Sequence, residues 1–267
     1  MHKVITETFK HLLAARCKAL IPYITAGDPD LDVTMQLVIE LERNGANIVE
    51  LGVPFSDPVA DGPTIQRASL RALQQGTTLH GIVDAVASIR EHSRIPIVLM
   101  TYYNPILAYG IQTFCWEAAR AGVDGLIIPD LPPEESEELT VACREQHIAN
   151  IFLVAPTSTT TRIELANRYT TGFVYCVSLT GVTGARGQMA EGVDEFMATV
   201  RKHTDRPLAI GFGISTPEHA REAAKLADGI IVGSAIINVM EQCNNESEMI
   251  REVGSFIASL RAGIDQG

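Results

Sequence analysis

The sequence predicts an α/β fold, because the same pattern repeats along the whole chain. Short apolar segments rich in β-branched residues alternate with amphipathic segments of helical period. Both faces of the apolar segments are hydrophobic, which is typical of parallel strands that are covered on both sides. Eight such alternations with short connections are the number that closes a barrel. We therefore expect a single (β/α)8 TIM barrel, one domain over residues 1–267, with an extra N-terminal helix.

The expected strands, in chain order, are Ala19–Thr25, Asn47–Gly52, Ile95–Met100, Asp124–Ile128, Asn150–Val154, Gly172–Val177, Pro207–Gly211 and Asp228–Val232. The main expected helices are Asp32–Asn44, His80–His92, Gln112–Ala121, Glu134–Gln146, Arg162–Tyr169, Val193–His203, Pro217–Leu226 and Glu246–Ala262. An amphipathic segment, Thr6–Lys18, precedes the first strand and is expected to cover the bottom of the barrel. The alternative is an open doubly wound sheet. However, the turn after the first strand, Thr25–Asp30, lacks the Gly-x-Gly-x-x-Gly pattern of such sheets.

Three of the strands are introduced by similar short links. The links are Asn44–Asn47, Ala121–Asp124 and Ala227–Gly229. In each, a glycine ends the preceding helix or the turn after it, and a polar residue stands close to the strand. Links this short fit a parallel sheet in which every strand is followed by its own helix.

The composition narrows the class of protein. The chain has 267 residues, of which 46% are hydrophobic and 20% charged, as in an ordinary globular protein. Its formal net charge is −11 and it has no basic run, so we expect no nucleic-acid partner. The five cysteines are scattered without a Cys-x-x-Cys pair, which favours a reducing, cytoplasmic location. We expect neither a signal peptide nor a membrane span.

The most informative segment is the second strand with the loop that follows it, Ile48–Pro63. Glu50 lies within an apolar strand, where a buried carboxylate costs several kcal/mol unless it is paired or protonated. Asp57 and Asp61 follow on a loop rich in proline and glycine. We interpret the segment as a catalytic acid with a closing loop. The alternatives are that Glu50 only binds neighbouring backbone amides and that Asp61 only caps the next helix.

The carboxyl ends of the last strands suggest a phosphate site. Gly213 and Gly233 allow a ligand close to the backbone, and Ser215-Thr216-Pro217 is a helix start with free amide donors. Barrels of this type often bind phosphate at the loops after strands 7 and 8. No lysine or arginine is obvious at these ends, so binding would rest on amides and helix dipoles.

Other candidate residues carry weaker signals. The loop Thr180–Gly187 has three glycines, a composition that suits either a lid or a plain solvated loop. Tyr175 shares a face with Phe173 and Val177, so core packing is its alternative role. The seven histidines show no metal-binding spacing, and we expect no metal. No serine-hydrolase motif or strand-end lysine indicates covalent catalysis.

Taken together, these motifs resemble the tryptophan synthase alpha chain family. The resemblance covers almost the whole chain, and its strand 2 segment is highly specific. The matching segments are Pro22–Pro29, Glu50–Pro63, Pro129–Pro132, Gly181–Gly184, Gly211–Ser215 and Val232–Ala235.

The resemblance implies a lyase that cleaves indole-3-glycerol phosphate to indole and glyceraldehyde 3-phosphate, without a cofactor of its own. Glu50 matches the general acid/base, and Asp61 matches the carboxylate that holds the indole N–H. Thr183 matches the lid residue that meets this aspartate on closure. The remaining substrate-binding positions by resemblance are Tyr23, Tyr175, Gly184, Phe212, Gly213, Gly233 and Ser234.

Two positions differ from residues that other members of the family carry. Tyr23 stands where members often have phenylalanine, and Leu179 stands where some carry arginine.

The resemblance also implies a partner, the tryptophan synthase beta chain, in an α2β2 heterotetramer. The expected docking residues on the catalytic face are Asp57, Pro58, Asn104 and Pro132. Three alternatives remain open from the sequence: a free-standing lyase that releases indole without a beta partner, another phosphate-binding barrel enzyme, and a barrel that only binds phosphate or a partner.

Overall fold

The computed structural model describes residues 3–177, 192–211 and 213–266 of the chain. Its strands are β1 (Ala19–Thr25), β2 (Val49–Gly52), β3 (Ile97–Met100), β4 (Gly125–Ile127), β5 (Ala149–Ile151), β6 (Leu153–Val154), β7 (Val174–Val177), β8 (Leu208–Gly211) and β9 (Gly229–Val232). The helices of the first half are α1 (Lys3–Ala14), α2 (Leu31–Arg43), α3 (Pro63–Gln74), α4 (Leu79–Ile89), α5 (Tyr103–Tyr109), α6 (Ile111–Ala121), the 3₁₀ turn η1 (Pro133–Glu135) and α7 (Glu137–Glu145). Those of the second half are α8 (Thr160–Tyr169), α9 (Val193–Lys202), α10 (Pro217–Leu226), α11 (Ser234–Glu241) and α12 (Glu246–Asp265).

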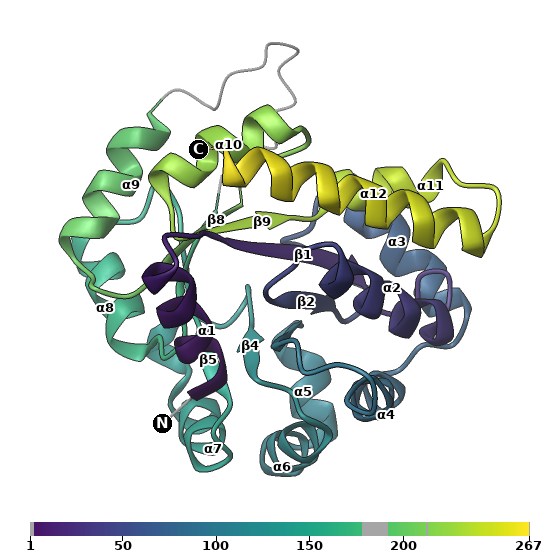
Figure 1. The fold of residues 1–267 in the computed structure, drawn as a ribbon. Helices are drawn as coiled ribbons and strands as arrows, with labels where there is room; N and C mark the ends of the chain where they lie inside the picture. Colours follow the sequence, from purple (N-terminus) through teal and green to yellow (C-terminus); the bar gives the residue numbers. More distant parts are fainter. Residues whose placement is uncertain (1–2, 178–191, 212, 267) are drawn as a thin grey trace.

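The strands form a parallel barrel with the helices around it (Figure 1). The order is β5-β4-β3-β2-β1-β9-β8-β7-β6, and every recorded strand pairing is parallel. Its two end strands, β5 and β6, are consecutive in the chain and separated by Phe152 alone, so this segment closes the ring. Together they correspond to the expected fifth strand, Asn150–Val154. The predicted eight-stranded barrel is confirmed.

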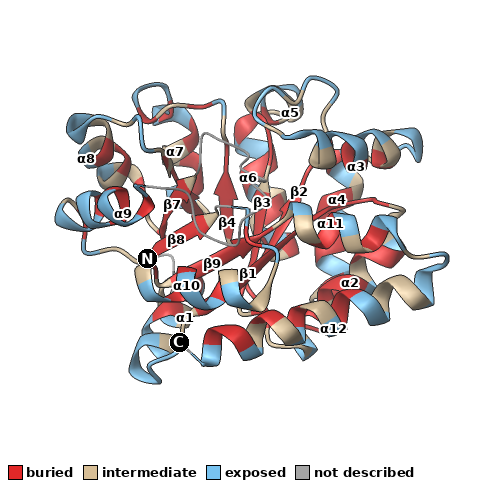
Figure 2. Cartoon of the chain, turned by 90° about the horizontal axis from the view of Figure 1, so that it is seen from above, coloured by how far each residue is buried: buried red, intermediate tan, exposed pale blue. Residues whose placement is uncertain are grey.

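The strands and helices bury the faces expected for a barrel covered on both sides. All residues of β1, β2 and β9 are buried, and helices such as α2 bury one stripe while exposing the other (Figure 2). Among the described residues, no helix is both long and apolar enough to cross a membrane.

Helix α1 covers the bottom of the barrel, as predicted, although it begins and ends three to four residues earlier than the expected Thr6–Lys18. Its apolar residues Ile5 and Phe9 are buried among side chains of the barrel interior. The ring of Phe9 lies 5.6 Å from that of Phe173, centroid to centroid. The interior is therefore closed at the amino-terminal ends of the strands, and a ligand must approach from the other end.

The polar residues in the three similar links share one role. Asn47 Oδ1 accepts the backbone N–H of Leu20, and Asp124 Oδ2 accepts that of Ile97, both at 2.9 Å. Asp228 Oδ2 accepts the N–H of Leu208, also at 2.9 Å. Each side chain thus bonds the start of the neighbouring strand in place of a backbone carbonyl. This explains why β2, β4 and β9 begin after these residues rather than at them.

Candidate active site

Glu50 lies in the middle of β2, paired with Tyr23 of β1 on one side and Val98 of β3 on the other. Its side chain is 1% exposed, and neither carboxylate oxygen has a hydrogen-bond partner among the described residues. The alternative that Glu50 binds neighbouring backbone amides is therefore wrong. Burial, with a smaller contribution from the charge of Asp61, raises the pKa of Glu50 to about 8. Glu50 is thus mainly protonated at neutral pH, and it can both donate and accept a proton.

Asp61 lies on the loop between β2 and α3 and is half-buried. The N-cap of α3 is Gly62, not Asp61, so the capping alternative for Asp61 is wrong. Burial raises the pKa of Asp61 to about 6, and a hydrogen bond from the hydroxyl of Tyr102 partly opposes this shift. Asp61 is the second carboxyl group of the site, and it is ionised at a lower pH than Glu50.

Tyr102 is a site residue that the sequence analysis did not single out. Its hydroxyl donates to Asp61 and accepts the backbone N–H of Ala60 at 2.8 Å. Its ring stacks on Phe55, with 5.1 Å between centroids. Tyr102 therefore ties the loop after β2 to the end of β3. The partners are 42 residues apart in the chain, and the only sequence signal was an aromatic residue at a strand's carboxyl end.

Tyr23 and Tyr175 both lie against the buried carboxyl group. They are 6% and 9% exposed, and burial raises the pKa of each hydroxyl, with Asp61 and Glu50 adding to the effect. The Tyr23 hydroxyl lies 3.4 Å from Thr25 Oγ1. Tyr175 also packs in the cluster of the barrel interior, so its core role and a role in the site coexist. The two rings form part of the wall around Glu50.

Glycines make room for these tyrosines. A Cβ atom at Gly52 would lie 2.0 Å from the Tyr23 hydroxyl, and one at Gly211 would lie 2.9 Å from that of Tyr175. Glycine at the ends of β2 and β8 is thus a steric requirement of the tyrosine positions.

The predicted phosphate residues are placed in part. Gly213 has a φ of 65°, a left-handed conformation that favours glycine. Gly233 precedes α11, and Ser234 is the exposed first residue of that helix. Thr216 caps α10 by accepting the N–H of His219, as the sequence suggested. The other predicted substrate-binding residues, Thr183, Gly184 and Phe212, lie outside the described residues, as do Leu179 and the loop Thr180–Gly187.

An ion-pair network fixes the helix that follows Asp61. Arg71 of α3 binds the buried Asp28, which follows β1, through two hydrogen bonds of 2.8 and 2.7 Å. The same guanidinium binds Glu241 at the end of α11 at 2.7 Å. Because α11 begins at Ser234, Arg71 connects the element after Asp61 to the element at the predicted phosphate site.

The predicted docking residues lie on loops at the same end of the barrel as Glu50 and Asp61. Asp57 and Asn104 are exposed, and Pro58 and Pro132 are half-buried. Asp130, in the loop after β4, accepts the N–H of Tyr103 at 3.0 Å and so has a structural role in that loop. The structure brings these residues to one face but contains no partner chain that would test their role.

Comparison with known proteins gives the family. The family model described as tryptophan synthase alpha chain matches residues 9–264. The chain belongs to the tryptophan synthase alpha chain family. A curated alpha chain from Geobacter sp. (strain M21) is 49% identical over 98% of both chains, and one from Thermoanaerobacter sp. (strain X514) is 50% identical over 96% of this chain and 98% of its own.

Comparison with solved structures gives the same family. The tryptophan synthase subunit alpha of Legionella pneumophila str. Paris is 38% identical, with a TM-score of 0.89 and 98% coverage of both chains. A structure titled Mycobacterium tuberculosis tryptophan synthase matches with 36% identity, a TM-score of 0.90 and 98% coverage of both chains. The family catalyses the alpha reaction of tryptophan biosynthesis, so this chain is a lyase acting on indole-3-glycerol phosphate. Membership supports this interpretation over a free-standing lyase.

Proposed function

We propose that Glu50 is the general acid/base and Asp61 the electrostatic partner in the cleavage of indole-3-glycerol phosphate to indole and glyceraldehyde 3-phosphate. The observation that carries this assignment is the buried Glu50 carboxyl group with its pKa of about 8, beside Asp61 with a pKa of about 6. Two carboxyl groups whose environments separate their pKa values can take different roles at one pH.

The reaction needs one proton delivered and one removed. Protonated Glu50 donates its proton to indole C3, which places a positive charge on the ring nitrogen. The Glu50 carboxylate then takes the proton of the C3′ hydroxyl while the carbon–carbon bond breaks and its electron pair returns to the ring. The products are neutral indole and an aldehyde, and Glu50 is protonated again. General acid/base help of this kind contributes roughly 10²–10⁴-fold.

Asp61 stabilises the charged intermediate. Its carboxylate accepts the indole N–H and lies where the positive charge develops. The proposed substrate contacts besides these two carboxyl groups are Tyr23, Tyr175, Thr183, Gly184, Phe212, Gly213, Gly233 and Ser234. Those of Thr183, Gly184 and Phe212 rest on the family resemblance alone.

The direct test of the function is release of indole from indole-3-glycerol phosphate by the purified chain. Indole and glyceraldehyde 3-phosphate should form in equal amounts without an added cofactor. Formation of neither product, with or without a beta chain, would contradict the proposed function.

The family works with a beta subunit, and we propose an α2β2 heterotetramer that forms on the face of Asp57, Pro58, Asn104 and Pro132. Val59, next to Pro58, is 85% exposed, more than any other large apolar side chain of the described residues. In a size-exclusion experiment with the beta chain, Val59→Asp should abolish co-elution. Leu13→Asp is the matched control, since Leu13 is 73% exposed but lies on α1 at the other end of the barrel. Equal co-elution of both variants would contradict this docking face.

A cytoplasmic location is also a proposal. It is supported by the five cysteines, all of which are free.

A further inference from the structure

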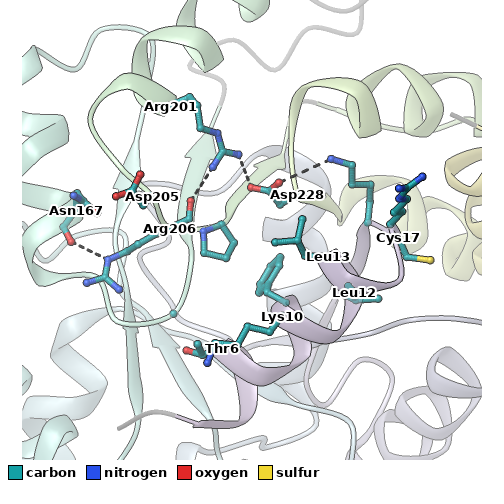
Figure 3. A pocket seen from close by; sticks show the side chains of 15 residues that line it. Thr6, Lys10, Leu12, Leu13, Cys17, Asn167, Arg201, Asp205, Arg206 and Asp228 are labelled. Atoms are coloured by element: carbon teal, nitrogen blue, oxygen red, sulfur yellow. Dashed lines mark hydrogen bonds and ion pairs between the residues drawn. The ribbon is translucent and has the colours of Figure 1, made fainter.

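A second cavity lies at the amino-terminal ends of the strands, opposite the face of Glu50 and Asp61. It has a volume of about 890 Å³ and lies between α1 and the segments that precede β7, β8 and β9 (Figure 3). Cavities of this size commonly hold small molecules. None of the residues proposed above for catalysis, substrate binding or docking lines it.

The charge of this cavity is opposite to that of the protein. Five cationic side chains and only two carboxylates line it, in a chain of net charge −11. One carboxylate, Asp228, is shared by Arg201 and by Lys18, whose Nζ lies 3.9 Å away. Arg16 and Arg206 form no ion pair with any described residue. A surplus of positive charge is therefore concentrated at one place on an acidic protein.

Arg206 is held in a fixed position without a carboxylate partner. Its Nε donates to the backbone carbonyl of Asn167 at 3.1 Å (Figure 3). The Asn167 side chain is itself fixed, because it accepts the Thr204 hydroxyl at 2.6 Å and donates to the His203 carbonyl at 3.0 Å. Arg206 is half-buried, and this burial lowers the pKa of its guanidinium. A partly desolvated cation with a free face is complemented best by an anion.

Part of the cavity wall is apolar. Phe9, Leu12 and Leu13 of α1 line the cavity together with Pro207, the residue after Arg206. Phe9 is buried, whereas the side chain of Leu13 is 73% exposed. An apolar surface beside a fixed guanidinium matches a molecule with one anionic and one apolar part.

We propose that this cavity binds a small organic anion, whose carboxylate, sulfonate or phosphate group contacts Arg206 while its apolar body packs against Leu12, Leu13 and Pro207. The site is separate from the catalytic one, because the barrel interior closed by Ile5 and Phe9 lies between them. The proposal does not depend on the assignment of Glu50 and Asp61.

The test uses 8-anilinonaphthalene-1-sulfonate as the probe and the full chain in 50 mM salt. Its fluorescence is titrated with the catalytic site saturated by indole-3-propanol phosphate, which cannot be cleaved because it lacks the C3′ hydroxyl. We expect one bound probe per chain and at least a tenfold weaker affinity in Arg206→Gln. Arg251→Gln is the matched control, because it removes the same charge from an exposed position on α12 and should bind like the wild type.

A second variant tests the same site independently of whether Arg206→Gln folds. Leu13→Asp places a negative charge, the same sign as that of the probe, on an exposed residue of the apolar wall. It should also weaken probe binding at least tenfold. Inorganic phosphate should displace the probe only at far higher concentration, because it lacks an apolar body. Unchanged affinity in both variants, or equal competition by inorganic phosphate, would overturn the proposal. So would self-association of the wild type that Leu13→Asp abolishes, since the cavity would then be covered by a second copy.

Discussion

The charge of Asp61 raises the pKa of Glu50, so the two carboxyl groups of the site are coupled although they lie on different elements. Burial contributes more than this coupling, and together they bring the pKa of Glu50 to about 8. Burial also raises the pKa of Asp61, while the hydrogen bond from Tyr102 limits the shift to a value of about 6. Between these values one carboxyl group is protonated and the other is ionised, which is the state that the proposed reaction requires.

The stability of the chain should depend on this shift. The pKa of Glu50 is about 8 in the folded chain and near 4.5 in the unfolded chain, so the folded state binds more protons between these values. Stability is therefore lost as pH rises through this window. From about pH 6.5 to 8, where Asp61 is mostly ionised, the wild type should lose roughly 2 kcal/mol relative to Glu50→Gln. Urea unfolding of both proteins measures this difference, and parallel stability curves would contradict the raised pKa.

The pH dependence of kcat/KM should be bell-shaped. Activity should rise as Asp61 ionises and fall as Glu50 loses its proton, with apparent pKa values near 6 and 8. These values belong to the coupled pair rather than to either residue alone. Steady-state kinetics from pH 5 to 9.5 test this, provided that the substrate dissociates from the enzyme faster than it reacts. A profile that stays flat through pH 8 and above would remove protonated Glu50 from the free enzyme's active form.

Tyr102→Phe should raise the pKa of Asp61, because it removes the hydroxyl that donates to the carboxylate. The acidic limb of the kcat/KM profile should move up by about one pH unit, the equivalent of one lost hydrogen bond to a charged group, and activity at pH 7 should fall about twofold. Tyr103→Phe is the neighbouring control, since its side chain makes no recorded hydrogen bond to Asp61. If both variants keep the wild-type acidic limb, the Tyr102 hydroxyl does not set the ionisation of Asp61.

Gly52→Ala should disturb the wall of the site. The added Cβ would lie 2.0 Å from the Tyr23 hydroxyl, and the buried ring has little room to move. We expect a loss of about 1–3 kcal/mol in unfolding free energy and a higher KM. Gly62→Ala is the steric control, since nothing lies within 4 Å of the position of its Cβ, and it should cost only what alanine costs at the N-cap of α3. Equal stability of the two variants would show that Tyr23 adapts freely.

The strands were predictable because β-branched apolar runs with short links are specific to covered parallel sheets. Helices α3, α5 and α11 were absent from the main expected helices. In α5, a seven-residue helix with Pro105 inside, no side chain caps the start. In α11, the apolar run of β9 resumes after only Gly233 and Ser234, so periodicity does not separate the strand from the helix.

The site could be predicted where the polarity of a residue differs from that of its neighbours. Glu50 could be recognised because burying a carboxylate inside an apolar strand costs free energy unless it is paired or protonated. The role of Tyr102 was not, because it depends on the approach of a loop 42 residues away. Arg71 was missed for the same reason, since a helix surface arginine does not reveal that Asp28 and Glu241 converge on it.

The most direct test of the account is the turnover of Glu50→Gln. The amide is isosteric with the protonated carboxyl group but cannot transfer the proton. We expect turnover to fall by at least about 10²-fold, while the affinity for indole-3-propanol phosphate and the melting temperature near pH 6 stay close to those of the wild type. Retention of more than a few per cent of wild-type turnover would contradict the central claim that Glu50 is the acid/base of this enzyme.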